Sequence, residues 1–324
     1  MPAPSDSHKV DAERIVDYDS GFDYRAFWGN RDYEGWVEAR VLQRLLPRLG
    51  HAHWFADFGG GFGRNAPSYL AIAERAILVD YSVINLTRAS EQLGPGIASG
   101  RVHLIRADLA HLPLVDAGVD AAMIVRVLHH FTDVEGCLTE MSRTVAGRWL
   151  VDVPIKHHIL GRVRGAARGR YREVRGPEPI VTGSTEYPFR TFQLEAVRTC
   201  LASAGFRTEI LASVNNFRRW DQVLPWVAVK RMRPLVYCLE RAAQRLGRGW
   251  WGPSQFLVAT RTVPQAAALA EAPSGIPAAL ADLARRLQCP ACRGQLAWSE
   301  TQAVCAECHR SYARQGAFWD FTLG

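Results

Sequence analysis

The chain has 324 residues, of which 48% are hydrophobic and 22% charged, and this composition is typical of a globular protein. The length allows one large domain plus a small one, and the formal net charge is +7. The polar segment 1–20 lacks the apolar core of a signal peptide. No run approaches the ~20 apolar residues that span a bilayer, and the apolar stretch 223–229 is too short. The sequence therefore predicts a cytoplasmic protein without a transmembrane segment.

The first predicted element is an amphipathic helix at 33–49, and alternating strands and helices follow it up to residue 154. Strands are predicted at 53–59, 76–82, 102–108, 120–130 and 148–154, and helices at 66–76, 83–93 and 133–145. Short apolar strands joined by helical crossovers are typical of buried parallel strands. The pattern predicts an α/β fold with a doubly wound sheet.

Later in the chain, a helix at 191–206 and strands at 207–214 and 254–260 are predicted to close the sheet. An amphipathic helix at 233–246 lies between those two strands. The predicted domains are a helical cover (1–50), a main domain (51–262) with insertions at 156–190 and 215–253, an Ala- and Pro-rich linker (263–284) and a compact unit (285–324).

Two segments carry the excess positive charge. Residues 156–176 hold seven Lys or Arg and one Glu, and residues 217–248 form the second segment. Such runs are either ordinary solvated surface or a substrate rim that attracts phosphate, nucleic acid or a membrane surface. The stretch "RYREVR" lacks the regularly spaced aromatic residues of a nucleic-acid platform.

The stretch "FADFGGGFGRN" is a glycine-rich turn after a predicted strand. A dinucleotide motif G-x-G-x-x-G started at Gly59 would end on Arg64, whereas a start at Gly61 fits formally but begins late in the turn. The Gly-Lys-Ser/Thr of a phosphate loop is absent. The best fit is acid-x-G-x-G-x-G, formed by Asp57, Gly59, Gly61 and Gly63. An acid at this place can hold an ammonium group but would repel a pyrophosphate.

Two further acids end the next two predicted strands. Asp80 lies where a carboxylate can accept both ribose hydroxyls, and Asp108 lies where it could meet an adenine amine. Each alone is equally explained as the N-cap of a following helix. Together with Asp57, at three successive strand ends, they describe a pocket for a positively charged adenosine.

These motifs resemble class I S-adenosylmethionine-dependent methyltransferases of the broad type that includes small-molecule and ubiquinone-pathway methylases. The resemblance rests on "FADFGGGFG", "LVDYS", "ADLAHLPLVDAGVD" and "VRVLHHFTDVEGCLTEMSRTV". It implies a Rossmann-like sheet of seven strands, with S-adenosyl-L-methionine as cofactor. The implied cofactor residues are Gly59, Gly61 and Gly63 at the methionine part, Asp80 and Tyr81 at the ribose, Asp108 and Leu109 at the adenine, Arg126 at the sulfonium end, and Asp57 ordering the turn or reaching the amino group through water.

Candidate catalytic residues follow the fourth predicted strand. His129 or His130 could act as a general base, because histidine titrates in the required range, or could simply pack against neighbouring helices. Arg126 could orient an anionic acceptor or brace the pocket, and His157 and His158 are further candidates. The Asn/Asp-Pro-Pro-Tyr/Phe signature of many exocyclic-amine methylases is absent.

Four cysteines near the end of the chain, Cys289, Cys292, Cys305 and Cys308, form two C-x2-C pairs. This spacing predicts one structural zinc ion, with a disulfide pair or an iron–sulfur site as alternatives. The pattern "CAECH" also matches a c-type haem attachment string, but without an export signal. The segment 287–321 resembles the small zinc ribbon of methyltransferase activators, which implies a role in stabilising the catalytic domain or in docking substrate.

The sequence thus predicts a methyltransferase that acts on an O, N or C atom of a small-molecule or lipid-like acceptor. One alternative is an RNA methyltransferase that docks RNA on the ribbon and the basic segments. The other is a non-catalytic binding or scaffold protein that retains the fold.

Overall fold

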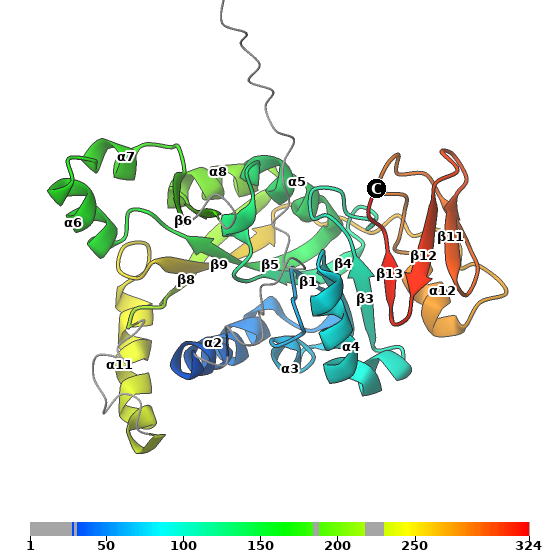
Figure 1. The fold of residues 1–324 in the computed structure, drawn as a ribbon, viewed down its shortest axis with the longest axis horizontal. Helices are drawn as coiled ribbons and strands as arrows, with labels where there is room; N and C mark the ends of the chain where they lie inside the picture. The colour runs from blue at the N-terminus through cyan, green and yellow to red at the C-terminus, as the bar shows by residue number, and fades with distance from the viewer. Residues whose placement is uncertain (1–27, 29–30, 184–187, 218–229, 324) are drawn as a thin grey trace, which may run out of the picture.

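The structure, a computed structural model, describes residue 28 and residues 31–183, 188–217 and 230–323. The polar segment 1–20 and residues 218–229, which include part of the second basic segment and the apolar stretch 223–229, lie outside these residues. Seven strands form a central sheet in the order β3-β2-β1-β4-β5-β9-β8 (Figure 1). They are β1 (Ala52–Phe58), β2 (Ala73–Asp80), β3 (Val102–Arg106), β4 (Val119–Ile124), β5 (Val145–Pro154), β8 (Phe206–Val214) and β9 (Ser254–Arg261).

The first five strands run parallel, and only β9 runs antiparallel to its neighbours β5 and β8. Helices cover both faces, as expected when right-handed crossovers join parallel strands. They are α2 (Asp32–Leu45), the short η1 (Leu46–Leu49), α3 (Ala66–Tyr69), α4 (Val83–Ala98), α5 (Val134–Thr144) and α8 (Leu194–Ser203). The predicted doubly wound α/β sheet is confirmed.

Alternate residues of β1 enter two separate hydrophobic cores. Trp54, Ala56 and Phe58 pack with residues of α5 and α8. Phe55 lies on the opposite face, in the core that contains residues of α2 and α4. This division follows from the two-residue period of a strand, which sends successive side chains to opposite faces.

Two predicted elements differ most in extent from the observed ones. The helix predicted at 66–76 ends at Tyr69, and Ala73 already pairs with Ala52 of β1. Alanine favours helix, but burial and pairing beside β1 outweigh that local preference. The strand predicted at 120–130 ends at Ile124, and residues 128–130 form the short helix η2 (Leu128–His130).

The described elements of the two predicted insertions lie at the left of the molecule in Figure 1. They contain α6 (Ile159–Ala167), α7 (Tyr171–Arg175), the hairpin of β6 (Ile180–Gly183) and β7 (Pro188–Thr191), η3 (Lys230–Met232) and α11 (Arg233–Leu246). In the described part of the chain, no helix combines the length and the apolar character needed to cross a membrane.

The C-terminal segment continues the central sheet. Its elements are α12 (Ala278–Ala284), β10 (Leu296–Trp298), β11 (Gln302–Cys305), β12 (Ser311–Gln315) and β13 (Phe318–Asp320). β13 pairs in parallel with β3, so the sheet has eleven strands (Figure 1). α12 falls within the predicted linker and buries Leu283 in the core. The domain boundaries themselves stay a prediction.

Candidate active site and metal centre

The glycine-rich turn begins directly after β1. Gly59, Gly61 and Gly63 have φ angles of 71°, 56° and 81°, which L side chains rarely adopt. A Cβ at Gly59 would lie 2.4 Å from Val127, and one at Gly63 would lie 2.8 Å from Leu93. The three glycines with positive φ are therefore those of the predicted acid-x-G-x-G-x-G spacing that starts at Asp57. At Gly59 and Gly63, close packing is a second reason why a side chain would not fit.

Asp80 ties this turn to the start of α4. Its Oδ2 accepts a hydrogen bond from the Gly61 amide at 2.8 Å, and its Oδ1 accepts one from the Ser82 amide at 3.0 Å. Ser82 is in turn the N-cap of α4, because its hydroxyl accepts from the Asn85 amide at 3.1 Å. Asp80 thus has a structural task in addition to the predicted contact with a ribose.

Asp57 lies under the same turn and is 2% exposed. Its Oδ2 has no hydrogen-bond partner among the described residues. Burial, and secondly the negative charge of Asp80, raise the pKa of Asp57 to about 8. A buried carboxyl group is costly when ionised, and a nearby cation would remove that cost.

The predicted adenine residues follow β3. Asp108 accepts from the Ala110 amide at 2.9 Å and lies 3.3 Å from Nδ1 of His111, so its position is set by a local turn. Leu109 is buried in the hydrophobic core that also contains residues of α5. Next to Asp80, the carbonyl of Tyr81 accepts from Nε of Arg106 at 2.9 Å.

Arg126 occupies the end of β4 in a left-handed conformation, with φ of 64°. Its amide donates to Asp152 at 3.1 Å, and its guanidinium donates to Glu38 at 2.6 Å and to Asn215 at 3.0 Å. These contacts hold the Arg126 side chain in place. They leave little of the guanidinium for the anionic acceptor that the sequence also allowed.

Glu38 of α2 is the centre of this network and was not predicted from the sequence. It is 1% exposed and also forms an ion pair with Arg64, whose guanidinium lies 3.6 Å from the ring centre of Trp28. Burial alone would raise the pKa of Glu38, but the charges of Arg126 and Arg64 lower it to about 2. The sequence signal that could have identified Glu38 is an acidic residue among the apolar positions of the amphipathic helix predicted at 33–49.

Asp152 of β5 is a second acid that the sequence did not reveal. It is 4% exposed and accepts a hydrogen bond from the Ser254 hydroxyl in addition to the Arg126 amide. Burial raises the pKa of Asp152 to about 6, against the opposing effects of Arg126 and Ser254.

His129 and His130 lie next to each other in η2, with ring centres 3.9 Å apart. The ring of His129 stacks on Phe189 of β7 at 4.2 Å, and the carbonyl of His130 accepts from Arg190 at 3.3 Å. Burial, and secondly the charge of Arg190, lower the pKa of His130 to about 4. The β6–β7 hairpin therefore covers both predicted histidines.

His157 and His158 lie between the end of β5 and the start of α6. Burial lowers the pKa of both, to about 4 for His158. Lys156 donates to the carbonyls of Glu173 and Glu178, which holds the α7 segment against the end of β5.

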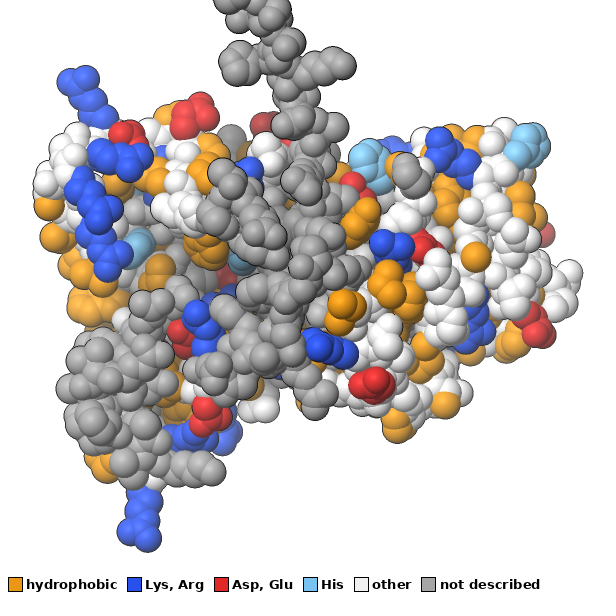
Figure 2. All heavy atoms as spheres, viewed as in Figure 1, with side chains coloured by type: hydrophobic (Ala, Val, Ile, Leu, Met, Phe, Trp, Pro, Cys, Tyr) orange, Lys and Arg blue, Asp and Glu red, His pale blue; other side chains and the backbone are white. Residues whose placement is uncertain are grey.

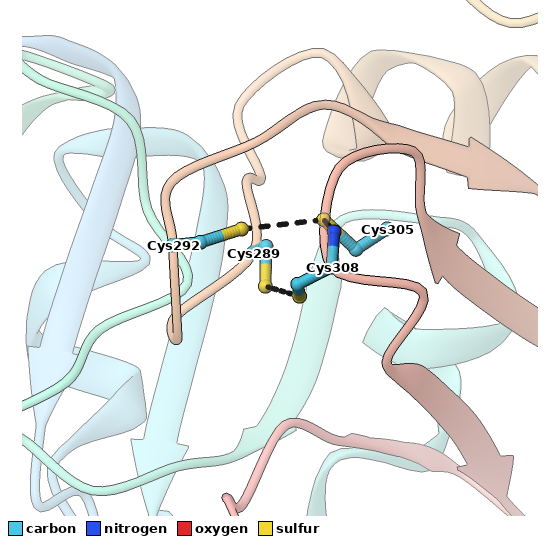
Figure 3. A group of neighbouring side chains, drawn as sticks. All are labelled: Cys289, Cys292, Cys305 and Cys308. Atoms are coloured by element: carbon cyan, nitrogen blue, oxygen red, sulfur yellow. Dashed lines mark hydrogen bonds between the residues drawn. The ribbon is translucent and has the colours of Figure 1, made fainter.

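The four predicted cysteines form one cluster at the C-terminal end of the molecule (Figure 3). Their sulfur atoms all lie within 4.8 Å of one another, with Cys289 and Cys308 3.6 Å apart and Cys292 and Cys305 3.4 Å apart. Tetrahedral zinc with Zn–S bonds of about 2.3 Å sets sulfur atoms roughly 3.8 Å apart. The cluster therefore fits a tetrahedral metal ion.

The two C-x2-C turns share one backbone geometry. The amide of Arg293 donates to the Cys289 carbonyl at 2.8 Å, and the amide of His309 donates to the Cys305 carbonyl at 3.1 Å. Arg293 and His309 both have positive φ angles, of 63° and 59°. Two matching turns that face each other present four thiolates to one point, whereas a disulfide needs only one pair.

The strand order and the glycine turn define the protein as one with a class I methyltransferase fold. Residues 56–147 match the family described as "Methyltransferase domain". A protein of Mycobacterium tuberculosis assigned as an S-adenosylmethionine-dependent methyltransferase is 31% identical over 119 residues, which cover 37% of this chain and 41% of that protein. The O-methyltransferase rstn1 of Aspergillus nomiae is 25% identical over 139 residues, 40% of this chain and 61% of that protein.

One solved structure is similar in fold. A structure assigned as an S-adenosylmethionine-dependent methyltransferase from Listeria monocytogenes has a TM-score of 0.50 and 13% identity, and it covers 71% of this chain and 98% of that one. The matches to the curated relatives span about two fifths to three fifths of their length. The family match at residues 56–147 covers the part of the sheet that carries Asp57, Asp80 and Asp108.

Proposed function

We propose that this chain is an S-adenosylmethionine-dependent methyltransferase that acts on a small-molecule or lipid-like acceptor. The observation that supports this best is the buried carboxyl group of Asp57 below the glycine turn, with one oxygen unpartnered among the described residues. The ammonium group of S-adenosylmethionine would supply the missing positive charge. A pyrophosphate would add negative charge beside Asp57 and Asp80 instead.

When bound, the cofactor supplies a methyl group on a sulfonium centre that is already activated for in-line displacement. The chain then needs to bind, orient and exclude water. Asp57 and the glycines of the turn, Gly59, Gly61 and Gly63, would lie at the methionine part. Asp80 and Tyr81 would lie at the ribose, and Asp108 and Leu109 at the adenine. Arg126 is kept rigid by Glu38 and would form the wall near the sulfonium.

His129 is the better candidate for a general base on the acceptor side. His130 has a pKa of about 4 because it is buried, and so weak a base gains little from its position. Phe189 stacks on His129 and belongs to a hairpin that could help to exclude water from the acceptor.

We further propose that the four-cysteine cluster binds one structural zinc ion. Its sulfur–sulfur distances and its paired turns support this proposal, and thiolates are the ligands that zinc prefers. The ion would hold β10–β13 in shape and, through β13, support the edge of the catalytic sheet.

Titration calorimetry with S-adenosylmethionine tests cofactor binding. We expect the wild type to bind, Asp57→Asn and Asp80→Ala to bind at least tenfold more weakly, and the exposed control Glu271→Gln to bind like the wild type. No binding by the wild type would instead support a scaffold protein.

A second experiment tests the acceptor class. The cofactor carries a labelled methyl group, and the label is counted in the lipid, small-molecule and nucleic-acid fractions of a cell extract. Label in the nucleic-acid fraction would favour RNA methylation.

A further inference from the structure

Helix α6 presents apolar side chains to solvent instead of to the core. Leu160 and Val163 are 55% and 60% exposed, and Ile159 is also exposed. The buried residue of this helix is Gly165, which lies against Val174 of α7. A helix that buries glycine and exposes its large apolar residues has its hydrophobic face available for another surface.

Helix α11 continues the same apolar surface. Val236, Glu240 and Gln244 face the protein, whereas Leu239 and Leu246 face outward, with Leu246 74% exposed. Trp250 and Trp251 follow the helix and are both exposed. The Ile159 amide donates to the Trp250 carbonyl at 2.8 Å, so the start of α6 and the end of α11 are adjacent.

Basic residues surround these apolar side chains. Arg162 and Arg164 on α6 and Arg168 directly after it are exposed, as are Arg245 and Arg248 at the end of α11. The acid Glu173 of α7 is already paired with Arg170 at 2.5 Å. Figure 2 shows blue side chains above an orange patch at the left margin, at the end where Figure 1 places α6 and α11.

We propose that this surface, formed by α6, the end of α11 and the two tryptophans, docks onto an anionic lipid bilayer. Apolar residues would enter the boundary between headgroups and acyl chains, tryptophan would lie at that boundary, and the arginines would contact lipid phosphates. An RNA surface would match the arginines but would leave the exposed leucines, valine and isoleucine in water.

The same surface lies close to the acceptor side of the sheet. Only residues 155–158 separate β5 from α6, and Lys156 holds α7 against the end of that strand. A lipid-borne acceptor could therefore reach the site from the bilayer. This last step rests on the proposed function, whereas membrane binding rests on the surface alone.

Vesicle flotation of the full-length protein tests the proposal. We expect the wild type to float with vesicles of equal parts phosphatidylcholine and phosphatidylglycerol, and weakly or not at all with phosphatidylcholine alone. Val163→Glu combined with Leu246→Glu should abolish flotation. Arg164→Gln combined with Arg168→Gln should lower the partition coefficient by more than tenfold, since each basic residue near an anionic surface contributes about fivefold.

Val263→Glu is the matched control, because Val263 is 72% exposed but lies outside this surface. It should float like the wild type. Failure of the wild type to bind anionic vesicles overturns the proposal, and so does unchanged flotation of the Val163/Leu246 variant. If the Val163/Leu246 substitutions leave vesicle binding unchanged and RNA competes with the vesicles, the surface binds nucleic acid instead. In calorimetry, the same variants should bind S-adenosylmethionine as tightly as the wild type. A loss of cofactor binding would therefore be detected independently of a loss of membrane binding.

Discussion

Arg106 at the end of β3 forms an ion pair with Asp320 of β13, with 2.9 Å between Nη1 and Oδ2. The same guanidinium donates through Nε to the Tyr81 carbonyl and lies 5.2 Å from the ring centre of Tyr81. One side chain thus joins the cysteine-rich segment to the loop after β2, where the ribose is expected. The segment is therefore connected to the expected cofactor site both by strand pairing and by this arginine.

Asp320→Asn should lower the free energy of unfolding by about 1–2 kcal/mol, because the pair is mostly buried and charge-assisted. Urea unfolding measures this effect. The control Glu209→Gln removes an exposed ion pair with Arg48 and should change stability by less than about 0.5 kcal/mol. Equal effects for the two variants would show that the Arg106 pair has no special role.

Replacement of a cluster cysteine should remove the metal. We expect about one zinc per chain in the wild type by elemental analysis, and far less in Cys292→Ser or Cys308→Ser. Both variants should unfold at lower temperature, because metal binding contributes to the folding of so small a unit. Cys238→Ser is the matched control, since Cys238 is exposed and lies outside the cluster. A wild type without metal would contradict the assignment.

Asp57 should make stability fall as the pH rises. Its pKa is about 8 in the folded protein and about 3.9 in an unfolded chain, so between these values the folded state binds one more proton. This contribution to stability is complete at low pH and is lost between about pH 4 and 8, at up to about 1.4 kcal/mol per pH unit. Asp152 acts in the same direction over a narrower range, up to its pKa of about 6.

Urea unfolding at several pH values compares the wild type with Asp57→Asn. The free energy of unfolding should fall less steeply with pH in the variant than in the wild type. The difference should be clearest between pH 6 and 8, where Asp152 contributes least. Asp116→Asn, at a residue whose side chain is 51% exposed, should keep the wild-type slope. Identical slopes in the wild type and Asp57→Asn would refute the assigned pKa.

Glu38→Gln should be strongly destabilising. It removes the buried acid between Arg64 and Arg126 and leaves their charges uncompensated, which typically costs about 3–5 kcal/mol. Thermal and urea unfolding measure the loss. The control Glu91→Gln, at an exposed position of α4, should be close to wild type. A small loss in Glu38→Gln would mean that water replaces the carboxylate easily.

The sequence predicted those features whose signal is local. The strands 53–59, 102–108, 207–214 and 254–260 were found within about two residues of their observed positions, because buried strands are short apolar runs. The cysteine spacing likewise predicted a cluster that the structure confirms.

What the sequence did not reveal depends on contacts between distant residues. Glu38 meets Arg64 and Arg126 only because α2 packs beside the ends of β1 and β4. The parallel pairing of β13 with β3 joins residues more than 200 positions apart through a strand of only three residues. Neither arrangement leaves a periodic pattern in the chain, since both are fixed by tertiary packing.

That pairing also affects how the protein is made. The edge of β3 stays open, with unpaired amides and carbonyls, until residues 318–320 have left the ribosome and β13 can add to it. Open strand edges are sites where one chain can pair with another. Translation that stalls before residue 318 would therefore release a chain that has all seven strands of the central sheet but an exposed, aggregation-prone edge at β3.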